Sequence, residues 1–157
     1  MASSYKCALI YAGLANATVG AQTITVANGY ENAVGSRVHS LSAVPPLDVL
    51  GVMFKAGAPL ILIVPGGMPP LSSKGEIEWD MGVEIRGVCA SGATPVDAYW
   101  SLVGDCIKWI HTKRTEWHSS VVDTTILSVV PWGELTKPHA GFVMSINIRY
   151  CTTVLAP

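Results

Sequence analysis

Four carboxylates at alternate positions are the residues of this chain whose types and spacing come closest to a chemical site: Glu76, Glu78, Asp80 and Glu84. Two carboxyl groups at a suitable separation can hydrolyse a glycosidic bond, and several together can bind calcium. Alternate positions of a single strand, however, point outward in a row and do not converge on a cleft. We therefore interpret these residues as a solvated sheet face, with a functional acidic surface as the alternative.

Side chains that could pair as nucleophile and base are also present. Cys106 and His111 lie in one predicted helix, but five residues correspond to about 500° of rotation, so they point to different sides. His118 stands next to Ser119 and Ser120, and an ordinary surface or capping role explains it more simply. We expect the protein not to be an enzyme.

The histidines and cysteines give no sign of a metal or redox site, because no two of them have metal-ligand spacing. They are His39, His111, His118 and His139, and Cys7, Cys89, Cys106 and Cys151. We expect the cysteines to be buried free thiols in a reducing cytoplasm. Gly66-Gly67 follows a predicted strand, as a phosphate loop would, but no lysine or helix start comes after it, so it is interpreted as a turn. No cofactor is expected.

The chain has five tryptophans, which could suggest base stacking: Trp79, Trp100, Trp109, Trp117 and Trp132. No basic groove accompanies them, and the formal net charge of −1 attracts neither nucleic acid nor an anionic membrane. Trp79 belongs to the inward side of a predicted strand. Trp100 and Trp109 lie off the predicted apolar stripe of their helix, so we expect them to pack on loops or on another subunit.

Alternation defines the strand that carries the carboxylates. Between residues 76 and 88, apolar residues (Ile77, Trp79, Met81, Val83, Ile85) alternate with polar ones, which predicts a strand with one buried and one wet face. A helix that covers the buried face is predicted for Pro95–Lys113. Thr94 and Pro95 are typical of a helix start, and the apolar stripe comprises Val96, Tyr99, Val103, Ile107 and Ile110.

A terminal hairpin follows, with predicted strands at residues 121–130 and 141–154. The second strand alternates, whereas both parities of the first are apolar. Such a strand is expected at the centre of the sheet or in a buried subunit contact. Upstream, we predict a first helix within residues 1–17, a strand at 22–26, a turn at 27–29, an irregular segment at 35–57 and a buried strand at 60–64.

Two loops are candidate docking sites. The loop at residues 65–75 is stiffened by prolines and presents Met68, Leu71 and Lys74. The tip of the terminal hairpin presents Trp132 and Glu134. In an assembly protein such tips touch neighbouring subunits, so we expect that deleting residues 68–74 or replacing Trp132 disturbs assembly while the subunit stays folded.

The bulk composition favours assembly. The chain has 157 residues, the length of one domain, and we treat residues 1–157 as one unit. Half of the residues are hydrophobic, only 13% are charged and the mean hydropathy is +0.40, so apolar surface is expected in subunit contacts. The predicted fold class is α+β, with a mainly antiparallel sheet of four to five strands and two helices packed on one face.

The order of these elements resembles that of bacteriophage tail terminator proteins, from about Tyr5 to Val154. Residues 58–64, the helix from Pro95 to His111 and residues 145–150 (Ser-Ile-Asn-Ile-Arg-Tyr) carry the resemblance. It implies a ring, typically hexameric, that caps the tail tube, stops its polymerisation and docks the neck or head-completion protein. The implied location is the virion tail or neck, after assembly in the host cytoplasm.

The resemblance also gives the carboxylate row a role. If sheets face the inside of the ring, Glu76, Glu78, Asp80 and Glu84 repeat around the lumen and repel DNA, which then passes without specific binding. The alternatives are another neck or head-completion connector, a tail tube subunit with more strand and less helix, and, from a different class, a small-ligand-binding or enzymatic α+β domain.

Overall fold

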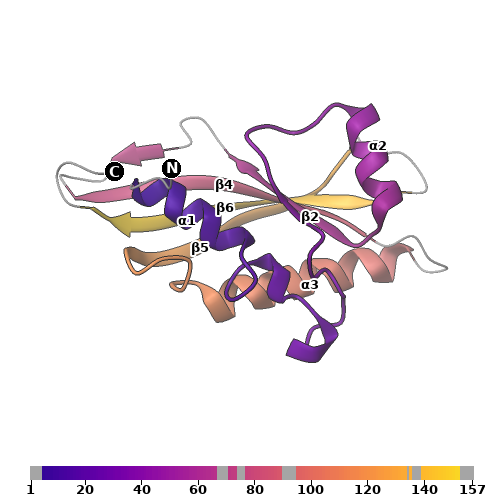
Figure 1. Cartoon of the computed structure of the whole chain (residues 1–157), viewed down its shortest axis with the longest axis horizontal. Coiled ribbons are helices and arrows are strands. Elements are labelled where there is room, and N and C mark those ends of the chain that lie inside the picture. The colour runs from indigo at the N-terminus through magenta and orange to yellow at the C-terminus, as the bar shows by residue number, and fades with distance from the viewer. Residues whose placement is uncertain are drawn as a thin grey trace.

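The computed structural model describes residues 5–66, 71–73, 77–89, 95–133, 135 and 139–152 (Figure 1). Its helices are α1 (Lys6–Ala15), α2 (Leu47–Ala56) and α3 (Pro95–Lys113), and its strands are β1 (Val38–Ser40), β2 (Leu60–Pro65), β3 (Leu71–Ser73), β4 (Glu78–Val88), β5 (Val121–Pro131) and β6 (Gly141–Cys151). Two short 3-10 helices, η1 (Ala21–Thr23) and η2 (Val26–Asn28), lie between α1 and β1. The described part of the chain is therefore an α+β fold.

The strands form one six-stranded sheet in the order β1-β2-β4-β6-β5, with β3 also paired to β4. Among the described strands, only β1 and β2 pair in a parallel manner. The four longer strands match the predicted strands at residues 60–64, 76–88, 121–130 and 141–154, with ends that differ by a few residues. The prediction of a mainly antiparallel sheet is confirmed.

One face of the sheet meets α1 and α3 in the main hydrophobic core, where alternate residues of β4 and β6 are buried. The members from the sheet include Ile61, Ile63, Met81, Val83, Ile85, Met144, Ile146 and Ile148, and those from the helices include Ile10, Leu14, Leu102, Cys106, Trp109 and Ile110. The alternation predicted for β4 is confirmed. Trp79 packs against this core, whereas Ile77 precedes the strand and is exposed.

The apolar stripe of α3 differs from the predicted one. Val103 and Ile110 are buried and Tyr99 and Ile107 pack partly against the core, as expected. Val96 is exposed, however, and the buried side also includes Leu102 and Cys106. The buried side of α3 is therefore rotated about the helix axis relative to the predicted stripe, toward Leu102 and Cys106. Asp97 in the first turn and Lys113 in the last complement the helix dipole.

Trp109 and Trp100 lie on different sides of α3. Trp109 is fully buried, and its indole Nε1 donates a 3.0 Å hydrogen bond to the carbonyl of Val19, so it packs on a loop, as one of the two expected alternatives. Trp100 is 62% exposed. One helix thus carries both a core tryptophan and a surface tryptophan.

The other face of the sheet is covered at one end by α2, which lies at the upper right of Figure 1. Leu50 and Phe54 of this helix pack on Leu60, Leu62 and Val88 in a second, smaller core. Leu60 and Leu62 alternate along β2 with Ile61 and Ile63 of the main core, so the two cores use opposite faces.

The expectation of an irregular segment at residues 35–57 is wrong, since the segment contains β1 and α2. The prolines that suggested a loop stand before the helix, with Pro46 at its N-cap. Asp48 lies in the first turn, and Gly57, at a φ of 141°, follows the last residue. Leu50 and Phe54 are four residues apart and therefore share the buried side.

The predicted strand at residues 22–26 is also wrong, because this segment forms η1 and part of η2. It buries the adjacent residues Thr23 and Ile24, which a strand would point to opposite faces. The predicted turn at residues 27–29 is confirmed, with Gly29 at a φ of 85°.

Side chains of α3 contact the segment at residues 18–32, which we call the N-terminal segment. The carboxylate of Asp105 is buried and accepts hydrogen bonds from the backbone N–H groups of Glu31 and Asn32 and from the Asn32 amide, at 3.1, 2.7 and 2.8 Å. Lys108 donates to the carbonyl of Gly29 at 2.6 Å, and its ammonium lies 4.9 Å from the centre of the Tyr30 ring. The segment is therefore fixed by its contacts with one helix.

Candidate functional site

The candidate nucleophiles lie where they cannot pair. Cys106 is fully buried, and burial raises the pKa of its thiol far above the usual range, whereas His111 is exposed at the end of α3. Burial also raises the pKa of Cys89 to about 11. Both thiols are protonated at neutral pH, and reactivity requires the thiolate. All four cysteines are free, as expected, but of the four only Cys89 and Cys106 are buried.

His118 and Ser120 are in contact, but the contact belongs to a turn. Nδ1 of His118 lies 2.8 Å from the Ser120 hydroxyl and accepts the Ser120 backbone N–H at 3.1 Å. The N–H of Val121 closes the same turn onto the carbonyl of His118. The arrangement thus fixes the start of β5. Among the described residues, no group of three or more His, Cys, Asp and Glu side chains could hold a metal ion.

Three of the four predicted lumen carboxylates lie on β4, on the face opposite the main core: Glu78, Asp80 and Glu84. Two of them have arginine partners in the same chain. Arg86 donates two hydrogen bonds to Oε2 of Glu84, at 2.7 and 2.9 Å, and Arg149 of β6 lies 3.3 Å from Oδ1 of Asp80. The arginines compensate much of the negative charge that the sequence suggested for this face. Glu76 lies outside the described residues.

Trp132, a predicted assembly contact, has a buried side chain. It belongs to the second core with Leu50 and Phe54, and only 4% of it is exposed. The guanidinium of Arg86 lies 4.9 Å from the centre of its ring, the geometry of a cation–π contact. This burial contradicts an exposed docking role, because removing Trp132 opens a cavity in the core. The prediction of an exposed contact was wrong for Trp132, because Leu50 and Phe54 of α2 pack in the same core as this residue.

Of the contacts predicted in the loop at residues 65–75, only Leu71 lies within the described residues. It begins β3, pairs with Met81 of β4 and packs partly against the main core, so it is not at a free loop tip. Met68, Lys74 and Glu134 lie outside the described residues.

The strand β5 is the clearest candidate for a contact surface. It is an edge strand and, in the described part of the chain, pairs only with β6. The predicted central position is therefore wrong, and a subunit contact is the remaining interpretation of its apolar residues. Val122, Leu127 and Val130 are 49%, 65% and 49% exposed. An edge strand of this length with exposed apolar residues is unusual in a monomer, since it invites pairing with another chain.

A groove of about 370 Å³ lies next to this edge, on the part of the second sheet face that α2 does not cover. Ser72 of β3 lines one side of it, and Leu127 and Ser128 of β5 line the other, with Asp80 and Asn147 between them. The register shifts between Ile126 and Ser128, which marks an irregularity at Leu127. We use the name assembly edge for β5 with its exposed residues Val122, Leu127 and Val130.

A second exposed apolar area lies on the first turns of α3. Val96 lines a groove of about 360 Å³ with Tyr99 and with Pro131, the last residue of β5, and Trp100 is exposed in the next turn of the helix. The sequence predicted Trp100 as a residue that packs on loops or on another subunit. In the described part of the chain its side chain stays largely exposed, which leaves the subunit contact as a hypothesis.

No helix in the described part of the chain is both long and apolar enough to cross a membrane. No known protein-family model matches the chain, and no curated protein sequence is significantly similar to it. The assignment of a function therefore depends on the surfaces described above.

Proposed function

We propose that this protein is a structural subunit that assembles with copies of itself into a ring, typically hexameric, and that the ring caps a phage tail tube. The ring stops polymerisation of the tube and docks the neck or head-completion protein. The assembly edge is the observation that carries the proposal. Its three exposed apolar residues lie on a strand whose outer hydrogen-bonding groups are available for pairing with another chain.

The distribution of exposed apolar residues supports a closed ring in preference to a simple two-fold dimer. A ring needs two different surfaces on each subunit, because each copy contacts its neighbours in a head-to-tail manner. The assembly edge is a strand, whereas Val96 and Trp100 lie in the first turns of α3, near the last residue of β5. We assign the two contacts of each subunit to these two elements.

The paired charges revise the proposed lumen. Arg86 and Arg149 compensate Glu84 and Asp80 within each subunit, so the face carries alternating charges in place of an uninterrupted negative row. A wall with paired charges binds phosphates weakly, because each arginine is already engaged by a carboxylate. We therefore propose that DNA passes without specific binding because these charges are paired, and not because unpaired carboxylates repel its phosphates.

The test is the mass of the purified protein in solution, measured by light scattering, and its shape in electron microscopy. We expect a ring. Leu127→Lys should dissociate it, because the substitution adds a charge to the contact. Val26→Lys is the matched control, since Val26 is also 65% exposed but lies on η2. A monomeric wild-type protein, or equal effects of the two substitutions, would contradict the proposed ring.

A second measurement separates a tube cap from another connector. Rings added to polymerising tail tube subunits should produce capped tubes of limited length. Rings that form normally but leave tube length unchanged would favour the alternative of a neck or head-completion connector.

A further inference from the structure

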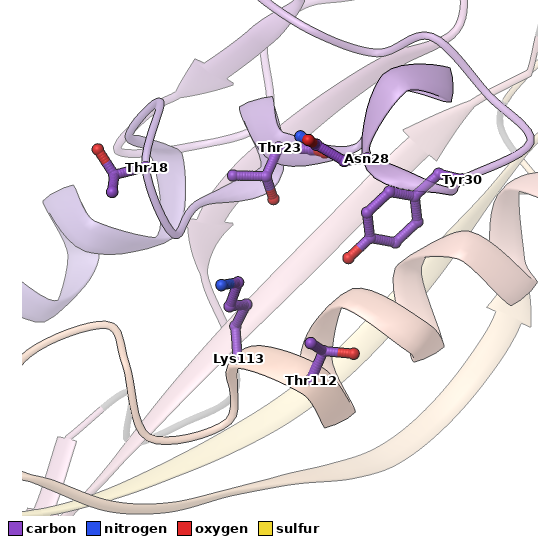
Figure 2. A pocket seen from close by; sticks show the side chains of 6 residues that line it. All are labelled: Thr18, Thr23, Asn28, Tyr30, Thr112 and Lys113. Carbon is purple, nitrogen blue, oxygen red and sulfur yellow. The ribbon is translucent and has the colours of Figure 1, made fainter.

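A cavity of about 270 Å³ lies between the N-terminal segment and the last turn of α3 (Figure 2). Its lining consists of polar side chains: Thr18, Thr23, Asn28, Tyr30, Thr112 and Lys113. None of them is acidic and one is cationic. Such a lining offers many hydrogen-bond donors and one positive charge, which is the composition expected around a small anion.

Several of these donors are available to a ligand. In Figure 2 the hydroxyl of Tyr30 and the ammonium of Lys113 both extend into the space between the segment and the helix. Within the part of the chain that the structure describes, no hydrogen bond engages the hydroxyls of Tyr30 and Thr112. Burial, and secondarily the nearby Asp105, raises the pKa of Tyr30, which keeps the hydroxyl protonated and able to donate.

Lys113 has one partner at its exposed side, Glu116, at 3.1 Å. An ammonium carries three N–H groups, so two remain for the cavity. The ion pair is partly exposed and therefore weak, and an anion in the cavity can compete with it. The carbonyls at the C-terminal end of α3 also favour a cation here, which limits the affinity for an anion.

The walls of the cavity are held before any ligand arrives. Asn28 donates from its side-chain amide to the carbonyl of Thr23 at 2.9 Å, and the hydroxyl of Thr23 donates to the carbonyl of Gly20 at 2.8 Å. Lys108 fixes Tyr30 and Gly29 from the side of α3. A ligand therefore need not order the site, which reduces the entropic cost of binding.

We infer that this cavity binds a phosphate-sized oxyanion, through the ammonium of Lys113 and the hydroxyls of Tyr30 and Thr112. The group is a phosphate, either free or carried as the monoester of a larger molecule. With one cation and a competing carboxylate, we expect a dissociation constant on the order of 1 mM at low ionic strength. This site is independent of ring formation, because the assembly edge lies on another part of the fold.

The test is an amide-shift titration of the full chain with inorganic phosphate, glycerol phosphate and chloride at neutral pH. We expect saturable shifts at residues 18–30 and 112–113 with either phosphate compound and none with chloride. Tighter binding of glycerol phosphate would identify a carried phosphate, and tighter binding of inorganic phosphate would identify the free ion. The absence of saturable shifts up to about 20 mM phosphate would overturn the site.

Variants assign the site to its residues. Lys113→Met should weaken phosphate binding by about tenfold or more, and Tyr30→Phe by about three- to tenfold, because each removes a donor. Glu116→Gln should strengthen binding, since it frees Lys113. Lys6→Met on α1 is the control, because it removes the same charge outside the cavity lining and should leave binding unchanged. Equal affinities of wild type and a folded Lys113→Met variant would also overturn the proposal.

Discussion

The two faces of the sheet bury their residues to different extents. The face toward α1 and α3 carries a continuous apolar core, whereas the other carries a small core under α2, two arginine–carboxylate pairs and an open groove. Burial of apolar area is the main source of stability, so the first face contributes most to folding. The second face and the adjoining assembly edge therefore contribute less to folding and leave more of their surface exposed.

The largest effect is expected on the first face. Trp109→Ala should reduce the free energy of unfolding by about 3–5 kcal/mol, because it opens a cavity and leaves the carbonyl of Val19 without its donor. Trp100→Ala, in the same helix but at an exposed position, should cost less than about 0.5 kcal/mol. Urea unfolding measures both. Similar losses of stability in the two variants would show that the buried and exposed sides of α3 are assigned incorrectly.

On the second face, Trp132→Ala should cost roughly 3 kcal/mol, at the lower end of the range for removal of a buried tryptophan. The second core is smaller than the main core. In addition, Nε1 of Trp132 has no hydrogen-bond partner among the described residues, so the substitution breaks no hydrogen bond. Trp132→Phe keeps a ring beneath Arg86 and should lose less. Urea unfolding measures the stability of both variants. An alanine variant as stable as wild type would show that Trp132 is not a core residue and would support its role as a surface contact.

The arginine pairs of the second face should matter less. Arg149→Met removes one partner of Asp80, which is 3.3 Å away, and should cost about 0.5–1 kcal/mol because 46% of the Arg149 side chain is exposed. The same variant should bind DNA no more tightly than wild type, since it also removes a positive charge. Thermal melting gives the first result and a filter-binding assay the second. A loss comparable to that of Trp132→Ala would mean that this pair is part of a core.

The smallest effect concerns pH. A hydrogen bond from Arg114 holds the pKa of Asp123 below its usual value. The folded-state pKa is therefore lower than the unfolded one, so the stabilisation is present above about pH 4 and is lost as the pH falls through the folded-state pKa. Both side chains are largely exposed, so we expect at most about 1 kcal/mol. Asp123→Asn should be less stable than wild type at neutral pH and equal to it at acidic pH; a pH-independent difference would refute this role.

Periodicity predicted the long strands and α3 because each of them alternates or repeats against one buried surface. It did not predict α2, whose buried side consists of Leu50 and Phe54 and follows two prolines. It misplaced β5, since exposed apolar residues give an edge strand the same pattern as a central one. The sequence thus distinguishes apolar from polar positions, but not burial within the subunit from exposure at an edge.

The candidate site was less predictable than the fold. The contact between Asp105 and Asn32 joins residues 73 positions apart, and neither residue belongs to a recognisable motif. The contact of Arg86 with Trp132 and the cavity beside Lys113 likewise depend on how segments pack in three dimensions. A sequence-based prediction could not find these contacts because their residues are far apart along the chain.

The attachment of the N-terminal segment to α3 has a consequence for synthesis on the ribosome. Glu31 and Asn32 emerge long before Asp105, which accepts their N–H groups. At roughly 5–20 residues per second, the 73 residues between Asn32 and Asp105 require about 4–15 s. During this interval Ile24 and Tyr30, which end up buried, have no partner surface on α3. The beginning of the chain therefore cannot complete its packing before α3 has been made, and a chaperone that shields this nascent segment would protect it during that interval.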